Sequence, residues 1–455
     1  MFQRHVRRRG GGWGETRLIL VGVRVTNGAV EYSGEQVRAW PKALRPFRRR
    51  EYRMLTGSMA MSLFASGLWL VAVVFQVMAW GGGPARLSVV ATSSSIGVVL
   101  SALVGGVAAD RMSRQRLLRI VELVRVVGAG LAGVLALAGW LQFWQLVIVA
   151  FALGAAEAFY FPAYSAMLPS LLHPDELLAA NGVEGSLRPV AQQALGPAAA
   201  GALVAVFMPG AAFGVAALAY GLALVFLLFM KPEAPVAEGP GDDESVLRQL
   251  REGFTFLFRT GWLFATLAFS ILYVTLLVGP LEVLLPFAVR DISASGGPKD
   301  YAFVLAAYGV GGVLGSVLMA SWRLPRRYLT VMLLLWGGGA IPMALIGITD
   351  RVWVMAAVTF VDGVTNAAAL VIWGTLLQRR VPTRLLGRVS SLDFFVSLAL
   401  MPVSMALAGP VGESIGIRPT FILVGALPIV LALTAIVAWR LPRDEKAHPL
   451  SATTR

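Results

Sequence analysis

A single acidic residue stands in the middle of a long apolar run. Glu157 lies within residues 154–160, among glycine, alanine and aromatic residues, and no basic residue lies within helical reach of it along the chain. Acidic side chains are rare in membrane-spanning helices and usually face a cavity. We therefore expect Glu157 to exchange protons or to bind a cation. A structural acid that only forms hydrogen bonds is the alternative.

A second acidic residue, Asp362, lies in a later apolar run, with Asn366 one turn further on. If the chain consists of two related halves, Asn366 occupies the position that corresponds to Glu157. Asp362 is then the next candidate for proton exchange, and Asn366 is expected to approach Glu157 across the centre of the molecule. Glu282 lies nearer one end of its run, where simple solvation explains it.

Two pairs of opposite charges have helical spacing. Glu122 and Arg125 are three residues apart, and Glu184 and Arg188 are four apart, so each pair lies on one helix face. Pairing would make both charges tolerable in an apolar run. For Arg188, which Gln192 follows by one turn, a position facing a central cavity is an equal alternative.

The elements that carry these residues are predicted to be membrane-spanning helices. The 455 residues are 57% hydrophobic and 14% charged, with a mean hydropathy of +0.72, whereas a soluble domain is about 45–50% apolar and about 25% charged. A helix needs about 20 apolar residues to cross a bilayer, and the runs lack the alternation of barrel strands. Twelve runs are predicted, at 55–80, 87–109, 117–140, 143–168, 184–207, 210–230, 262–288, 301–322, 329–348, 352–377, 389–412 and 419–440.

The positive charges fall mainly in the even-numbered gaps between these runs and near the two chain ends. This distribution argues against nucleic acid as a partner, although the net charge is +14. The positive-inside rule places both termini in the cytoplasm of a bacterial inner membrane protein. The chain contains no cysteine, so disulfides are excluded.

Five segments follow from this pattern. They are a basic cytoplasmic extension at 1–50, a six-helix bundle at 51–230, a cytoplasmic linker at 231–260, a second six-helix bundle at 261–441 and a cytoplasmic tail at 442–455. We expect the extension to be disordered or to result from a start codon placed too early, and binding of its arginines to the membrane surface is the alternative. The linker contains prolines, an acidic cluster and an amphipathic piece at 246–258, which predicts a short interfacial helix.

The junction of the second and third runs has a distinctive spacing. Gly106, Asp110, Arg111 and Arg114 follow the order Gly-x-x-x-Asp-Arg-x-x-Arg. At this position the spacing resembles the loop motif between helices 2 and 3 of the major facilitator superfamily. We expect Asp110 to act as a gate by capping the eleventh helix near 389–391, where free amides and the helix dipole attract a carboxylate. Solvation of a helix end is the alternative.

Two Gly-Pro pairs, Gly196-Pro197 and Gly409-Pro410, lie in the fifth and eleventh runs. Small residues beside a proline allow close packing and a bend. The first pair, in the order Gly-Pro-x-x-Ala-Gly, resembles the antiporter motif of drug exporters.

Aromatic residues in the fourth, tenth and eleventh runs could line a cavity for large apolar ligands. They include Tyr160, Tyr164, Trp373 and Phe394. Lipid contact or helix packing is the alternative.

From about residue 46 to 443 the chain resembles one branch of the major facilitator superfamily, which contains macrolide-efflux proteins, the enterobactin exporter and mycobacterial Tap-like pumps. The resemblance rests on the loop motif and on Phe161-Pro162-Ala163, Ala179-Ala180-Asn181 and Gly387-Arg388-Val389. It implies an all-α membrane protein in which two six-helix bundles rock about a central cavity. It also implies export of amphiphilic drugs or siderophore-like molecules in exchange for protons.

No nucleotide-binding P-loop is present, so ATP is not the expected energy source. We expect a monomeric transporter without cofactor or metal, in contact with the lipid bilayer. A lipid or lysophospholipid transporter of the same fold and a non-transporting scaffold are the alternatives. The three histidines, His5, His173 and His448, lie at the chain ends or in a loop, which argues against a membrane enzyme.

Overall fold

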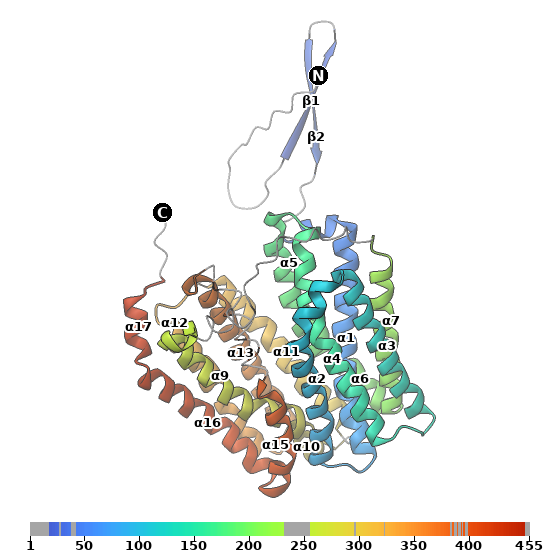
Figure 1. The fold of residues 1–455 in the computed structure, drawn as a ribbon, viewed down its shortest axis with the longest axis vertical. Coiled ribbons are helices and arrows are strands. Elements are labelled where there is room, and N and C mark those ends of the chain that lie inside the picture. Colours follow the sequence, from blue (N-terminus) through green and yellow to red (C-terminus); the bar gives the residue numbers. More distant parts are fainter. Residues whose placement is uncertain are drawn as a thin grey trace.

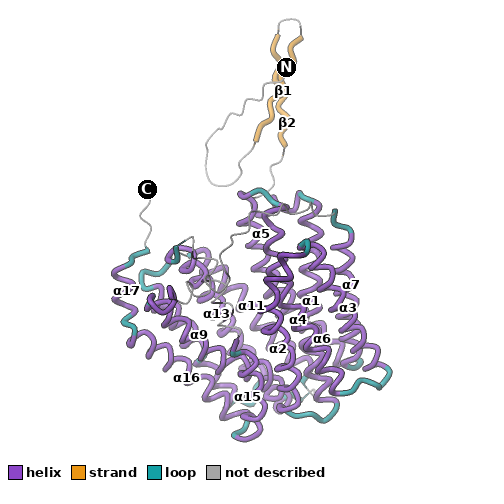
Figure 2. The backbone as a smooth tube through the Cα atoms, viewed as in Figure 1, coloured by secondary structure: helices purple, strands orange, loops and turns teal. Residues whose placement is uncertain are grey.

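The computed structural model describes residues 18–26, 29–37, 42–231, 255–294, 297–322, 324–382 and 399–450, together with residues 385, 389, 393 and 395. Within these ranges the side chains of residues 18–44, 103–111, 174, 175 and 178 lie outside the description. Figures 1 and 2 show two groups of long, roughly parallel helices and a hairpin that projects from one end.

The N-terminal bundle runs from residue 50 to residue 228. Its elements are α1 Arg50–Ala79, α2 Pro84–Arg111, α3 Arg114–Leu137, α4 Phe143–Leu171, α5 Pro174–Leu187, the π-helix η2 Arg188–Leu195, α6 Gly196–Val206 and α7 Pro209–Leu228. Proline occupies the first position of α2, α5 and α7, where its missing N–H has no acceptor to lose. At the start of α3 the Ser113 hydroxyl accepts from the Arg116 amide at 3.4 Å and caps the helix.

The C-terminal bundle repeats this pattern. Its elements are α9 Gly261–Gly279, the π-helix η3 Pro280–Leu284, α10 Leu285–Ile292, α11 Pro298–Ser321, α12 Tyr328–Gly339, the 3-10 helix η4 Ile341–Gly347, α13 Val352–Arg380, α15 Met401–Ser414, α16 Ile417–Ala438 and α17 Leu441–Ala447. Gly297, just before α11, has a φ of 100°, a left-handed conformation that side chains disfavour.

The part of the chain that is described contains eleven helical segments long and apolar enough to cross a membrane. They agree with eleven of the twelve predicted runs. The remaining predicted run, 389–412, is described only in part, by α15 and isolated residues before it. Large apolar side chains such as Leu218 are exposed on the outer faces of the bundles. This exposure fits a molecule whose solvent is lipid.

Two strands, β1 at Leu18–Thr26 and β2 at Ala29–Val37, pair in antiparallel order. Thr26 pairs with Ala29. The expected disordered extension is therefore wrong for these residues. The sequence contains the reason, because alternating β-branched residues flank Asn27-Gly28, the strongest short hairpin signal. A short 3-10 helix, η1 Lys42–Arg48, leads from the extension into α1.

The end of the molecule where α1 begins also carries α17, and we call it the terminal end (Figure 1). The opposite end, where α2 begins and α15 finishes, is the far end. Most of the predicted interfacial helix at 246–258 lies outside the described residues, and the chain is helical again at 255–259. The two bundles pack together through α2 with α15 and through η2 and α6 with α11.

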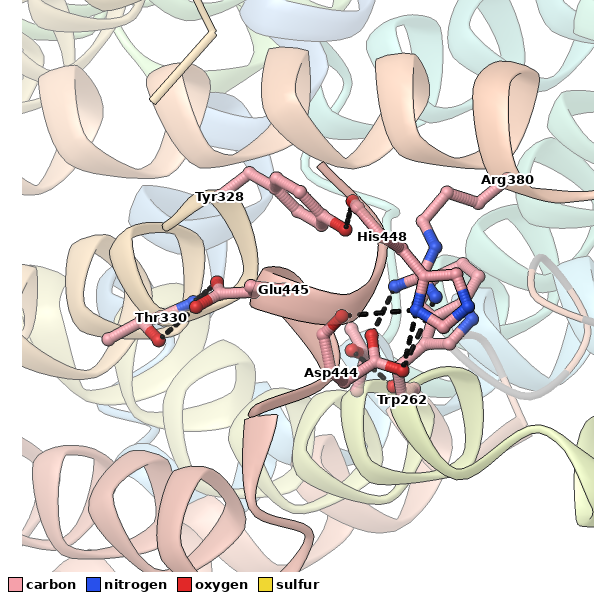
Figure 3. A network of polar contacts seen from close by, with 8 residues as sticks. Trp262, Tyr328, Thr330, Arg380, Asp444, Glu445 and His448 are labelled. Carbon is pink, nitrogen blue, oxygen red and sulfur yellow. Dashed lines mark hydrogen bonds and ion pairs between the residues drawn. The ribbon is translucent and has the colours of Figure 1, made fainter. Parts of the chain in front are cut away.

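The segment expected to be a plain cytoplasmic tail contains the helix α17, which docks on the C-terminal bundle. Figure 3 shows its polar contacts. Arg380, at the end of α13, donates to Asp444 at 2.5 and 3.3 Å, and its guanidinium lies 4.6 Å from the Trp262 ring centre. Glu445 accepts from the Thr330 amide at 2.7 Å and so caps α12. One short helix thereby ties together the terminal ends of α9, α12 and α13.

Candidate functional site

A buried ionic cluster lies at the centre of the N-terminal bundle. The Arg125 guanidinium, on α3, lies 2.5 Å from the Glu157 carboxylate on α4 and 3.6 Å from the Glu122 carboxylate one turn earlier on α3. It also donates to the Ser62 hydroxyl of α1 at 2.5 Å. Three helices therefore converge on one guanidinium, whose side chain is only 3% exposed.

This geometry corrects the prediction that Glu157 is a lone carboxylate. No basic residue lies within helical reach along α4, but the neighbouring helix supplies Arg125 from 32 positions away. The predicted pairing of Glu122 with Arg125 is present as well. An uncompensated charge in hydrocarbon is costly, so the bundle keeps these groups together.

The two carboxylates have different surroundings. Glu122 has a fully buried side chain, and its oxygens have no hydrogen-bond partner within the described residues. The Glu157 side chain is 36% exposed. Of the two carboxylates, that of Glu157 is therefore the one open to solvent.

Aromatic rings close the cluster. The Arg125 guanidinium lies 4.8 Å from the ring centre of Tyr160 and 5.6 Å from that of Tyr220, which adds cation–π attraction. Tyr160 stacks on Tyr164, and both are buried in the bundle core. In this conformation these two tyrosines pack inside the bundle, as the packing alternative has it. That they line a ligand cavity stays a prediction.

The corresponding region of the C-terminal bundle contains Asp362 and Asn366 on α13. The Asp362 side chain is buried, and both carboxylate oxygens have no hydrogen-bond partner among the residues that the structure describes. Tyr273 and Tyr308 lie close enough to Asp362 for its charge to act on their hydroxyl groups. Asn366 is half-buried, and the described contacts include no hydrogen bond between it and Glu157.

Close glycine contacts relate the two bundles to each other. A Cβ on Gly154 of α4 would lie 2.0 Å from the Ser94 carbonyl oxygen of α2, and one on Gly363 of α13 would lie 2.2 Å from the Tyr308 carbonyl oxygen of α11. Glu157 follows Gly154 by three residues, and Asn366 follows Gly363 by three. The packing thus places Asn366 at the position that corresponds to Glu157, in agreement with the register inferred from the sequence.

A second pair of glycines gives the same register. Gly97 of α2 faces the Phe151 carbonyl oxygen at 2.3 Å, and Gly311 of α11 faces the Phe360 carbonyl oxygen at 2.2 Å, both measured from an added Cβ. Backbones can approach this closely only where no side chain intervenes. The helix pairs that hold Glu157 and Asp362 are therefore built in the same way.

The predicted cavity residues of the fifth span lie in the irregular helix η2 or next to it. The Arg188 guanidinium donates to the Gln192 amide oxygen at 3.4 Å and lies 5.7 Å from the Phe161 ring centre. Among the described residues no contact within 4 Å joins it to Glu184, although the charge of Arg188 acts on that carboxylate, so both alternatives for Arg188 stay predictions. Both Arg188 and Gln192 are half-buried.

Of the two Gly-Pro pairs predicted to allow close packing and a bend, the first lies at an irregular segment and the second inside the regular helix α15. The π-helix η2 ends directly before Gly196 and Pro197, where α6 begins. A Cβ on Gly196 would lie 2.6 Å from the Phe64 carbonyl oxygen of α1. Pro410 lies inside α15, and Gly409 contacts α2.

The other predicted site residues are described unevenly. Trp373 is buried and donates to Asp393 at 3.0 Å, so it does not face an open cavity in this state. Phe394 lies outside the described residues, as do the side chains of Gly106, Asp110 and Arg111. Arg114 donates to the Ala166 carbonyl oxygen of α4 at 2.9 Å. The gate at Asp110 stays a prediction.

One apolar groove of about 440 Å³ is present between α2, α4 and α15. Its lining includes Ser88, Thr92, Phe151 and Pro410 and none of the aromatic residues proposed from the sequence. Among the described residues no group of three or more acidic or histidine side chains could hold a metal ion.

Comparisons with known proteins agree with this architecture. The family model of transmembrane secretion effectors matches residues 41–454. The chain belongs to this family. It is a membrane transporter of the major facilitator superfamily, as the loop motif indicated.

Two of the related sequences are efflux proteins. Macrolide efflux protein A of Streptococcus pyogenes is 24% identical over 388 residues, which cover 82% of this chain and 92% of the relative. The multidrug efflux pump Tap of Mycobacterium tuberculosis is 27% identical over 394 residues, covering 84% of this chain and 91% of the pump.

Solved structures share the fold at low identity. The nucleoside transporter NupG superposes with a TM-score of 0.67 at 12% identity, over 85% of this chain and 98% of NupG. A bacterial homologue of the lysosomal transporter Spinster, in an inward-facing and unoccupied conformation, gives 0.64 at 15% identity, over 87% and 98% of the two chains.

Proposed function

We propose that this transporter exports amphiphilic small molecules across the inner membrane of a bacterium in exchange for protons. In this proposal both termini face the cytoplasm, and one chain suffices for transport. The observation that carries the proposal is the ratio of charges in the buried cluster, where Glu122 and Glu157 share the single guanidinium of Arg125.

Charge counting explains why the cluster can bind a proton. With both carboxylates ionised the cluster carries a net charge of minus one, which is unfavourable in a buried site. One proton makes the cluster neutral. Because Glu157 is the partly exposed member, the proton enters and leaves through it.

The same argument explains exchange. A cationic amphiphile can replace the proton as the neutralising charge, because its positive group takes the place beside Glu157. Proton and substrate then compete for one site, so that loading one releases the other. The similarity to efflux pumps supports the direction of transport.

The test uses purified protein in liposomes with an imposed pH gradient. Wild-type protein is expected to concentrate ethidium, a cationic amphiphile, and to exchange it between the two sides without a gradient. Glu157→Gln keeps the size of the side chain but cannot titrate, so it should lose pH-driven accumulation and retain exchange of a neutral macrolide. Glu176→Gln is the matched control: Glu176 pairs with Arg49 away from the cluster and accepts from the His173 amide, a hydrogen bond that glutamine can also accept, so this variant should behave as wild type.

Accumulation by Glu157→Gln equal to that of wild type would remove Glu157 from the coupling step. The buried Asp362 would then be tested by Asp362→Asn in the same assay. If the wild-type protein accumulates neither compound under a pH gradient of either direction, proton exchange itself is rejected.

A further inference from the structure

The two bundles are joined at the far end by a carboxylate. The Glu413 side chain, near the end of α15, accepts a hydrogen bond from the Ala85 amide at 2.9 Å. Ala85 is the second residue of α2, and the first amides of a helix have no partner within it. The positive end of the helix dipole adds to the attraction. Glu413 therefore caps a helix of the opposite bundle.

A second contact lies one turn along the same seam. The Gly409 amide donates to the Ser88 hydroxyl at 2.7 Å, and Ser88 is buried. A Cβ on Gly409 would lie 2.4 Å from the Ser88 oxygen and 2.6 Å from the Ala85 Cα. The two helices can thus meet here only because residue 409 has no side chain.

The two contacts are directional and cross from one bundle to the other. Each pairs a backbone amide of one bundle with a side-chain oxygen of the other, so neither survives a separation of α2 and α15. The arrangement also resembles, at the opposite end, the gate expected of Asp110, since an acid at one helix end caps a helix start in the partner bundle.

We propose that Glu413 and Ser88 form a latch that keeps the far end closed while the terminal end is open. Opening the far end, as alternating access requires, breaks both hydrogen bonds, and closing it restores them. This inference rests on the proposed transport cycle, but it concerns the position of the helices and does not depend on which ion drives export.

Distances between spin labels test the latch directly. The chain contains no cysteine, so Ile148→Cys on α4 and Ile415→Cys after α15 provide two unique labelling sites at exposed positions near the far end. Double electron–electron resonance of this labelled protein in lipid nanodiscs should give mainly a short distance. Adding Glu413→Gln replaces a charged hydrogen bond by a neutral one, and the ratio of long to short distances should rise about fivefold.

Three further variants sharpen the result. Gly409→Ala should give mainly the long distance, because its methyl group prevents closure. Ser88→Ala should raise the ratio of long to short distances by an intermediate amount. It replaces Gly409→Ala as the test of this contact if Gly409→Ala does not fold. Asp350→Asn is the matched control. Asp350 forms an exposed ion pair with Arg418, a residue of the same bundle, so this variant should leave the distances unchanged.

An unchanged distance distribution in both Glu413→Gln and Ser88→Ala would overturn the latch. The same result in the Asp350→Asn control and in Glu413→Gln would also overturn it, because the effect would then be a general loss of charge. The distance measurement requires no substrate or pH gradient. A latch that responds as expected in a protein without proton-driven accumulation would therefore reject the proposed function and leave the latch standing.

Discussion

Replacing Arg125 by methionine is the sharpest perturbation of the buried cluster. The variant Arg125→Met removes the cation that Glu122 and Glu157 share and leaves two carboxylates without compensation. Breaking a buried ion pair by removing one partner costs about 3–5 kcal/mol. We expect a loss of this size in the free energy of unfolding, together with loss of pH-driven accumulation.

The structure also predicts which second substitution restores stability. The Glu157 carboxylate is nearer to Arg125, at 2.5 Å, but its side chain is 36% exposed and water can replace part of the lost attraction. The Glu122 carboxylate lies 3.6 Å from the guanidinium and is fully buried. Two charges about 4 Å apart at an effective dielectric constant of ~20 attract each other by about 4 kcal/mol. When Arg125 is removed, the Glu122 carboxylate therefore loses more electrostatic stabilisation than the Glu157 carboxylate.

The assay is reversible unfolding in mixed micelles, followed by tryptophan fluorescence. Arg125→Met with Glu122→Gln should recover at least half of the lost stability, and Arg125→Met with Glu157→Gln clearly less. The triple variant, which has no charge in the cluster, should approach wild-type stability, because neutral replacements of buried ion pairs are often tolerated. If the Glu157→Gln combination recovers as much as the Glu122→Gln combination, the argument from burial is refuted.

Two further predictions concern packing and the docked helix. Gly363→Ala should destabilise the protein by about 1–3 kcal/mol, because the new methyl group meets the Tyr308 carbonyl oxygen. Gly374→Ala, on the same helix, has open space around it and should change the stability little. Thermal unfolding of the two variants measures this difference, and equal stability would contradict the prediction. Asp444→Asn should weaken the docking of α17 by about 1.5–3 kcal/mol. Amide hydrogen exchange in residues 441–447 should then become faster. Unchanged exchange there would show that the contact with Arg380 does not hold the helix.

The membrane-spanning helices were predictable because each satisfies its own backbone hydrogen bonds and reads as one apolar run. The partner of Glu157 was not, because one sequence does not show which face of α3 meets α4. A signal was nevertheless present. Glu122, Arg125 and Glu157 are three charges in two consecutive spans, and the expense of unpaired charge in lipid favours bringing them together. Pairing only within helical reach was too narrow a rule.

The site residues that the sequence missed depend on tertiary geometry. Glu413 reads as a helix-end acid and Ser88 as an ordinary small residue until α2 and α15 are placed side by side. The cavity role predicted for the aromatic residues cannot be judged in the same way, since Tyr160 and Trp373 are buried in this conformation. A transporter that changes shape has no single set of cavity-lining residues, so one hydropathy pattern cannot identify them.

The two bundles have the same backbone packing but carry different side chains at the equivalent positions. The same glycine contacts set the spacing of α2 with α4 and of α11 with α13, so the backbone places Glu157 and Asn366 at equivalent positions. Among the residues that the structure describes, the N-terminal position alone meets a guanidinium, because Arg125 lies on the neighbouring helix. In the C-terminal bundle a neutral amide takes the place of the acid, and the carboxylate of Asp362 sits one turn away, buried and without a hydrogen-bond partner among the described residues.

A charged, partly exposed cluster suits rapid exchange with water or a cation, whereas an isolated buried acid is tolerated only when neutral. We therefore assign the proposed exchange of protons against substrate to the N-terminal cluster, and a contribution from Asp362 would require a conformation that exposes it to water.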